Sequence, residues 1–176
     1  FPIAMGKLLK AVLEDILSDV PKDKIDDRII DFKNSMKLMD LDTISIPTGV
    51  KGITKYTVKG NGNSMRTSFK KGAPVHVKSA IAYNDLLKHF GKDKKYDIIR
   101  NRDKIRWVYL KTNPFGFDTL AYKGHEDPSE IIEFIKLHIN YEKIFNQLLT
   151  KKLDAFYKSL GWEEPTDKSQ SIEKFF

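Results

Sequence analysis

The chain has 176 residues, of which 40% are hydrophobic and 31% charged, and 31 Lys and Arg against 24 Asp and Glu give a net charge of +7. This length and composition predict one folded domain with a real core and exclude an intrinsically disordered chain. No stretch approaches the roughly 18 uninterrupted apolar residues of a membrane span. The absence of cysteine excludes disulfides, thiolate zinc sites and cysteine nucleophiles.

The positive charge is concentrated in the middle of the chain. Residues 48–111 hold 16 Lys and Arg against 4 Asp and Glu, a net charge of +12, whereas the remaining residues sum to −5. Such clustering is the electrostatic footprint of a surface that binds a polyanion. The alternative is a solvated, lysine-rich loop region.

The first forty residues have the pattern of two helices. Apolar residues recur at helical spacing and predict helices over about residues 3–18 and 23–40, with Asp23 as the N-cap of the second helix. The short connection between them predicts an antiparallel pair. We expect both apolar stripes to pack in the core.

A short strand and a glycine-rich basic segment are predicted next. Residues 43–46 alternate between polar and apolar side chains and predict a strand that ends at Pro47. Residues 48–71 mix glycines with lysines and predict a loop, with one strand around residues 53–58. The segment lacks the GxxxxGK[ST] spacing of a P-loop, which argues against nucleotide hydrolysis.

A helix, a strand pair and two closing helices complete the predicted fold. Asp127 is expected to be an N-cap with Pro128 at the first helical position, and Gly161 is expected to end the last helix. The predicted elements are a helix from Pro74 to Gly91, strands over 104–111 and 119–123, and helices over 128–137 and 141–160.

Candidate catalytic and metal-binding residues are few. The four histidines lack the spacing of a metal site, so no metal ligand is predicted. Asp40 and Asp42 form a D-x-D pair of the kind found in two-metal nucleases, but no third acidic cluster supports such a site. The residues therefore predict a binding protein without catalytic residues of its own. A small nuclease that uses Asp40 and Asp42 is the enzymatic alternative.

The last residues form an apolar motif after a polar stretch. Ile172, Phe175 and Phe176 have the spacing of a clamp-binding peptide, although Gln170 stands one place after the position of that pattern's usual glutamine. Exposed apolar clusters of this kind mark interaction sites. We expect these three residues to bind a partner. The alternative is that the tail folds back on its own domain.

Several segments, taken in order, carry a further resemblance. They are GITKY (52–56), PVHVK (74–78), AYN (82–84), KIRWVYL (104–110), NPFG (113–116), YEKIF (141–145) and LGW (160–162). In this order they resemble the thumb, or C-terminal, domain of family B DNA polymerases of the large tailed bacteriophage type. Almost the whole chain takes part in the resemblance.

The resemblance implies an α+β, mainly α-helical fold with a small antiparallel β portion. It implies a thumb domain over residues 1–163, with a basic loop and β centre at about 44–123, and a flexible tail over residues 164–176 that carries the clamp-binding peptide. The polymerising and proofreading carboxylates of the family lie in other domains, so this chain alone is expected to be inactive. Its start at Phe1 suggests a piece of a longer polymerase or a separately encoded subunit.

The expected contacts follow from the basic centre and the resemblance together. The expected partners are primer–template duplex DNA, the remainder of the polymerase (palm, fingers and exonuclease) and a sliding clamp bound by Ile172, Phe175 and Phe176, with no membrane, in the cytoplasm of a host cell. No cofactor is expected in this fragment, whereas Mg²⁺ and dNTPs serve the complete polymerase. A stand-alone nucleic-acid-binding accessory protein is the alternative. The predicted DNA-binding residues are Lys51, Lys55, Tyr56, Lys70, Lys71, His76, Lys78 and Lys104.

Overall fold

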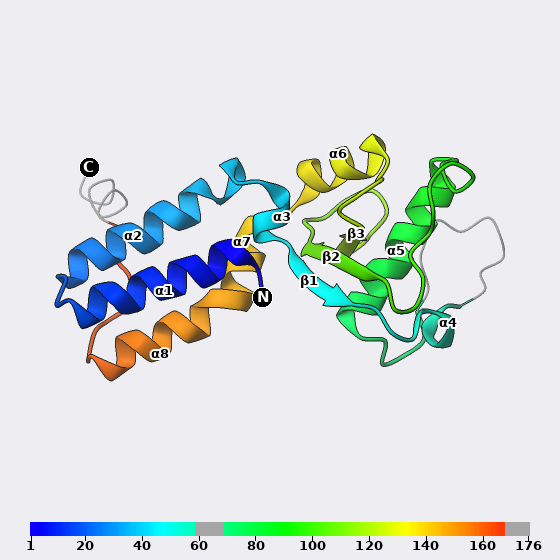
Figure 1. Ribbon diagram of the computed structural model, residues 1–176. Coiled ribbons are helices and arrows are strands. Elements are labelled where there is room, and N and C mark those ends of the chain that lie inside the picture. Colours follow the sequence, from blue (N-terminus) through cyan, green and yellow to red (C-terminus); the bar gives the residue numbers. More distant parts are fainter. Residues whose placement is uncertain (59–68, 168–176) are drawn as a thin grey trace. The chain divides into compact units, whose positions relative to one another are not determined.

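The computed structural model describes residues 1–58 and 69–167. These residues form helices and one three-stranded antiparallel sheet, which confirms the predicted α+β, mainly α-helical fold. The chain divides into two compact units (Figure 1): unit 1 consists of Phe1–Ile44 and Tyr141–Phe176, and unit 2 of Ser45–Asn140. In the described ranges, no helix has both the length and the apolar character needed to cross a membrane.

Unit 1 is a helical bundle built from both ends of the chain. Its three longest helices lie side by side and bury apolar faces that include Met5, Val12, Ile25 and Leu153 (Figure 1). Burial of such side chains is the main favourable term in helix association. The elements are α1 (Ile3–Leu17), α2 (Lys22–Ser35), a 3₁₀ turn (Met36–Leu38), α3 (Leu41–Ile44), α7 (Tyr141–Phe145), a π-helical turn (Asn146–Thr150) and α8 (Lys151–Ser159).

The predicted helical pair is confirmed, but the start of α2 differs from the prediction. Pro21, and not Asp23, is the N-cap, because the Pro21 carbonyl accepts the N–H groups of Lys24 and Ile25 at 3.1 and 3.3 Å. Asp23 instead lies in the first turn, where the negative charge of its carboxylate interacts favourably with the helix dipole. The predicted last helix is confirmed as α7, the π-helical turn and α8, and Gly161 (φ +65°) ends it as expected.

Unit 2 is a sheet packed against helices. The strands follow the order β1-β2-β3, all antiparallel, and every residue of β3 is buried. Helix α5 packs against β3, and nine of its residues are buried, including Val77, Tyr83 and Leu87. The elements are β1 (Ile46–Gly49), α4 (Ile53–Tyr56), α5 (Val75–His89), β2 (Lys104–Tyr109), β3 (Thr119–Tyr122) and α6 (Ser129–His138).

Buried hydroxyl groups in unit 2 are paired with one another. The Ser45 Oγ lies 2.7 Å from the Tyr122 hydroxyl, and the Ser79 hydroxyl donates to Thr119 Oγ1 at 2.7 Å. Buried polar groups that lack such partners cost about 1–3 kcal/mol each. The Ser79–Thr119 pair therefore lets α5 pack closely on β3 without that cost.

Two predicted strands are wrong. Residues 43–46 do not form a strand: Leu41–Ile44 is the helical turn α3, and the strand is Ile46–Gly49, with Pro47 inside it. Strand β1 lies at the edge of the sheet, where the missing N–H of a proline is tolerated. Residues 53–58 do not form a strand: Ile53–Tyr56 is the helix α4, and Thr57 makes a single bridge with Phe69.

The remaining elements of unit 2 confirm the predictions except at one cap. Helix α5, both strands of the hairpin and helix α6 occur where they were expected, with Gly91 (φ +66°) just after α5. Asp127 is not an N-cap: Pro128 occupies that position without a side-chain cap. The Asp127 carboxylate instead accepts hydrogen bonds from the backbone N–H groups of Lys123 and Gly124, both at 2.8 Å.

Candidate nucleic-acid interface

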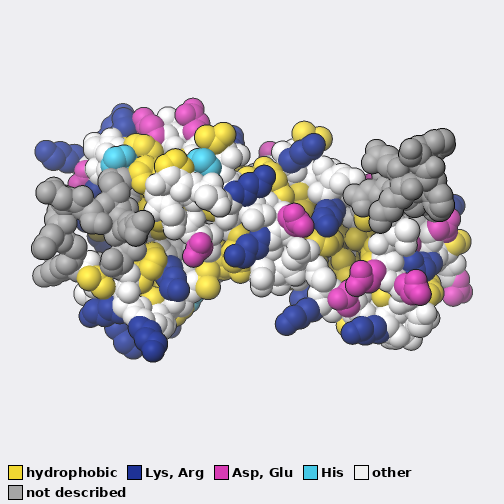
Figure 2. Space-filling view, turned by 180° about the vertical axis from the view of Figure 1, so that it is seen from behind, with side chains coloured by type: hydrophobic (Ala, Val, Ile, Leu, Met, Phe, Trp, Pro, Cys, Tyr) yellow, Lys and Arg dark blue, Asp and Glu magenta, His cyan; other side chains and the backbone are white. Residues whose placement is uncertain are grey.

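The positive charge of the protein belongs to one of its two units. Unit 2 holds 18 Lys and Arg against 9 Asp and Glu, a net charge of +9, whereas unit 1 has a net charge of −2. Figure 2 shows Lys and Arg side chains gathered at the lower edge of unit 2. This is the edge at which α4 lies in Figure 1. Unit 2 is therefore the electrostatic candidate for binding a polyanion.

The paired ends of β1 and β2 bring two of the predicted residues together. The Val50 N–H donates to the Asp103 carbonyl at 2.9 Å, and the Arg102 N–H donates to the Val50 carbonyl at 2.7 Å. These bonds hold Lys51 beside the loop that precedes Lys104. Both side chains are exposed. The same loop carries Arg100 and Arg102, which the sequence prediction did not single out.

Helix α4 is attached to this loop by one side chain. The side-chain Oδ1 of Asn101 accepts hydrogen bonds from the N–H groups of Gly52 and Ile53 at 3.1 and 2.8 Å, and so satisfies free donors at the start of the helix. Gly52 has φ +93°, a conformation that favours glycine. Lys55 follows on this helix, and its Nζ lies 5.1 Å from the centre of the Tyr56 ring.

The residues before α5 continue from α4. The Lys70 N–H donates to the Tyr56 carbonyl at 3.0 Å, and Lys71 starts a turn with Gly72 at φ +85°. Helix α4 contacts α5, which carries His76 and Lys78 near its start. Lys70, Lys71 and Lys78 are exposed, whereas Tyr56 and His76 are half-buried.

All eight predicted DNA-binding residues therefore lie on unit 2, in segments connected by hydrogen bonds and helix contacts. We call these eight residues the basic strip. In the described part of the chain, none of its six lysines has a carboxylate oxygen within 4.0 Å. Lysine is a flexible point charge well suited to phosphate oxygens. The strip can neutralise phosphates without breaking existing ion pairs.

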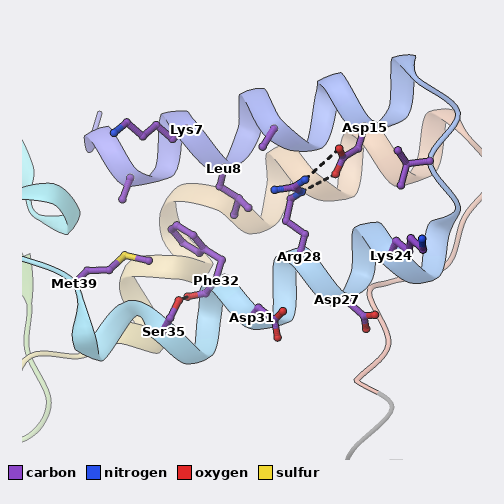
Figure 3. Close-up of a pocket in the computed structure, with 13 residues that line it drawn as sticks. Lys7, Leu8, Asp15, Lys24, Asp27, Arg28, Asp31, Phe32, Ser35 and Met39 are labelled. Atoms are coloured by element: carbon purple, nitrogen blue, oxygen red, sulfur yellow. Dashed lines mark hydrogen bonds and ion pairs between the residues drawn. The ribbon is translucent and has the colours of Figure 1, made fainter.

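Unit 1 has a hollow between α1 and α2, with a volume of about 840 Å³ (Figure 3). Within it, Arg28 Nε lies 2.6 Å from Asp15 Oδ2, which joins the two helices. Its charged side chains balance, so the hollow offers no net attraction to a polyanion. Those side chains are Lys7, Lys24, Arg28, Asp15, Asp27 and Asp31.

The other sequence candidates lie outside unit 2. Asp40 and Asp42 lie in unit 1, before and within the helical turn α3. Across residues 1–58 and 69–167, no three His, Asp or Glu side chains form a group that could hold a metal ion. The predicted clamp-binding residues Ile172, Phe175 and Phe176 lie outside the described residues, so that prediction stays a prediction from sequence.

Sequence reasoning missed the residues that organise the site. Asn101 anchors α4 from 48 residues away along the chain, and Arg100 and Arg102 share its loop. The run Arg100-Asn101-Arg102-Asp103-Lys104 was a visible signal, since it places three cations in five residues where a predicted strand begins. Models of known protein families and the sequences of curated proteins give no match to this chain.

Proposed function

We propose that this chain is the thumb part of a family B DNA-directed DNA polymerase and that unit 2 holds the primer–template duplex by its backbone phosphates. The observation that carries the proposal is the basic strip, which lies in one unit with a net charge of +9. Among the residues that the structure describes, its lysines have no carboxylate oxygen within 4.0 Å. The family assignment rests on the sequence resemblance alone.

Phosphate contacts suit the role of a thumb. A polymerase must move along any sequence, and contacts to phosphates position a protein without reading bases. The basic strip has lysines rather than the Arg, Asn and Gln side chains that read base edges in the major groove. The remainder of the polymerase would supply the catalytic carboxylates, with Mg²⁺ and dNTPs, and a sliding clamp would bind the tail.

Binding through phosphates should make the duplex affinity of the chain fall steeply as salt concentration rises. We expect the whole chain to bind two labelled duplexes of different sequence equally, with affinity falling about 10³–10⁵-fold between 50 and 200 mM salt if 6–10 phosphates are contacted. Replacing Lys51, Lys55, Lys70 and Lys71 by Gln should weaken binding strongly. It should also lower the slope of log affinity against log salt by about 0.9 for each phosphate that the variant no longer neutralises. Fluorescence anisotropy measures both quantities.

A matched control tests whether the location of the charge matters. Replacing four exposed lysines of unit 1, Lys7, Lys24, Lys37 and Lys158, removes the same charge and should leave the salt slope unchanged. A flat salt response of the unmodified chain, or an equal fall in affinity in both variants, would contradict the proposal. Duplex binding with no effect on primer extension by the remainder of the polymerase would favour the stand-alone accessory protein.

A further inference from the structure

A second cationic feature of unit 2 is a small hollow between the loop before β2 and the loop after β3. Its volume is about 290 Å³, at the lower limit of small-molecule sites, which suits one small anion. We call it the loop pocket. Its lining residues are Asp97, Ile98, Arg100, Asp103, Lys104, Lys123 and His125.

Strand pairing brings the two walls of the loop pocket together. Strands β2 and β3 are antiparallel, with Arg106 paired with Tyr122, so the start of β2 lies beside the end of β3. Lys104 and Lys123 are thereby brought to the same end of the hairpin, although they are 19 positions apart in the sequence. Lys123 and His125 lie beyond the basic stretch of residues 48–111 that the sequence had indicated.

Each wall is fixed by an aspartate that bonds the backbone. The Asp103 carboxylate accepts the Arg100 N–H at 2.8 Å, in a loop where Arg102 has φ +75°. The Asp127 carboxylate accepts the N–H groups of Lys123 and Gly124. Both loops are therefore held in place before a ligand arrives, which reduces the entropy cost of binding.

The cations of the loop pocket are available to a ligand. In the described part of the chain, no carboxylate oxygen lies within 4.0 Å of a side-chain nitrogen of Arg100, Lys104, Lys123 or His125. A planar guanidinium, two ammonium groups and an imidazole can all donate hydrogen bonds to phosphate oxygens.

The lining is mostly charged, and its three Lys and Arg side chains outnumber its two carboxylates, Asp97 and Asp103. Ile98 is its one apolar side chain, and no Phe, Tyr or Trp ring lines the pocket. The pocket thus offers hydrogen-bond donors to a phosphate group and little apolar surface to a nucleobase. Lys104 belongs to both the loop pocket and the basic strip, so the two are continuous.

We propose that the loop pocket binds a phosphate group and that this group is a backbone phosphate of the bound duplex. The phosphate chemistry follows from the pocket itself, whereas the source of the phosphate rests on the proposed function. Arg100, Lys123 and His125 thereby extend the DNA contact of unit 2 past the end of the basic strip.

The test uses the full chain with Lys123 and His125 both replaced by Gln. These changes leave the backbone bonds to Asp127 in place. Titration with inorganic phosphate, followed by amide NMR, should shift the resonances of residues 100–104 and 123–125 in the unmodified chain and not in the variant. Duplex affinity should fall about tenfold, and the salt slope should fall by about 0.9, the value for one phosphate.

Two comparison variants isolate the pocket. Replacing Lys111 and Lys136, exposed lysines of unit 2 outside the pocket, by Gln should leave the phosphate shifts unchanged. Replacing Lys123 by Arg should preserve both phosphate and duplex binding, because the charge is kept.

The outcomes separate this inference from the proposed function. Absence of phosphate shifts in the unmodified chain, together with an unchanged duplex salt slope in the Lys123→Gln, His125→Gln variant, would overturn the pocket and leave the proposed function standing. Phosphate shifts at the pocket with an unchanged duplex slope would overturn the backbone source. Phosphate shifts in a chain that binds no duplex would uphold the phosphate site and contradict the proposed function.

Discussion

Each unit contains a buried tyrosine whose hydroxyl group donates to an aspartate. In unit 2 the Tyr83 hydroxyl donates to Asp127 at 2.9 Å, and the same carboxylate fixes the loop after β3. In unit 1 the Tyr157 hydroxyl donates to Asp26 at 2.5 Å, and Lys22 Nζ lies 2.8 Å from that carboxylate. Burial, followed by the neighbouring carboxylate, raises the pKa of both tyrosines well above their ordinary value.

These raised pKa values predict a loss of stability in alkali. Above about pH 10, the ordinary tyrosine pKa, the unfolded chain releases phenol protons that the folded chain retains, so the free energy of unfolding falls as pH rises. Each tyrosine contributes a slope of about 1.4 kcal/mol per pH unit in this range. Urea unfolding between pH 9 and 11.5 measures the slope.

The variant that checks this explanation replaces Tyr83 and Tyr157 by Phe. Its stability at neutral pH should be lower, since two buried hydrogen bonds to carboxylates are removed. Its stability should nevertheless fall less steeply with pH than that of the unmodified chain. Equal slopes in the two proteins would show that other groups cause the alkaline loss.

At the scale of elements, α4 shows how a remote side chain determines local structure. Its sequence contains β-branched and aromatic residues that favour a strand. The side-chain Oδ1 of Asn101 nevertheless accepts hydrogen bonds from the N–H groups of Gly52 and Ile53 at the start of the helix. Lys51 and Lys55 of the basic strip flank this attachment.

We predict that Asn101→Ala weakens DNA binding without unfolding the protein. Removal of two exposed hydrogen bonds should lower the free energy of unfolding by about 1 kcal/mol. Duplex affinity should fall several-fold, because Lys51 and Lys55 must then be ordered when DNA binds. Urea unfolding and duplex anisotropy measure the two effects. Asn34→Ala, at an exposed position of α2, is the control, and an affinity equal to that of the control would refute the role of Asn101.

At the scale of the whole molecule, the two compact units differ both in how the chain forms them and in their net charge. Unit 2 is one continuous segment, Ser45–Asn140, whereas unit 1 is formed by both ends of the chain. Unit 2 has its own core, with α5 packed on the sheet, and it carries the net charge of +9. A compact unit with its own core is able to fold alone.

We therefore predict that residues 45–140 expressed alone fold and retain the salt-dependent binding of duplex DNA. The expected results are a cooperative unfolding transition and a salt slope close to that of the whole chain, measured by circular dichroism and anisotropy. The complementary protein, with residues 45–140 replaced by a Gly/Ser linker, should bind duplex DNA weakly because its net charge is negative. Comparable binding by that protein would place the interface elsewhere.

The sequence by itself determined the features that depend on near neighbours. Helical spacing of apolar residues is a local property, and it predicted α1, α5, α6 and α8. Gly91 and Gly161 ended their helices as expected, because each adopts a positive φ that glycine favours. The concentration of lysines between residues 48 and 111 was equally visible, and the eight predicted residues all lie on unit 2.

Only the tertiary structure decided the features that depend on partners far along the chain. Pro47 lies in a strand because β2 pairs with it at the sheet edge, and α4 is helical because Asn101 bonds its start. The loop pocket likewise exists because strand pairing places Lys104 beside the loop that carries Lys123. Periodicity and capping act within a few residues. Strand partners and remote hydrogen bonds are selected by packing of the whole unit, which no local pattern records.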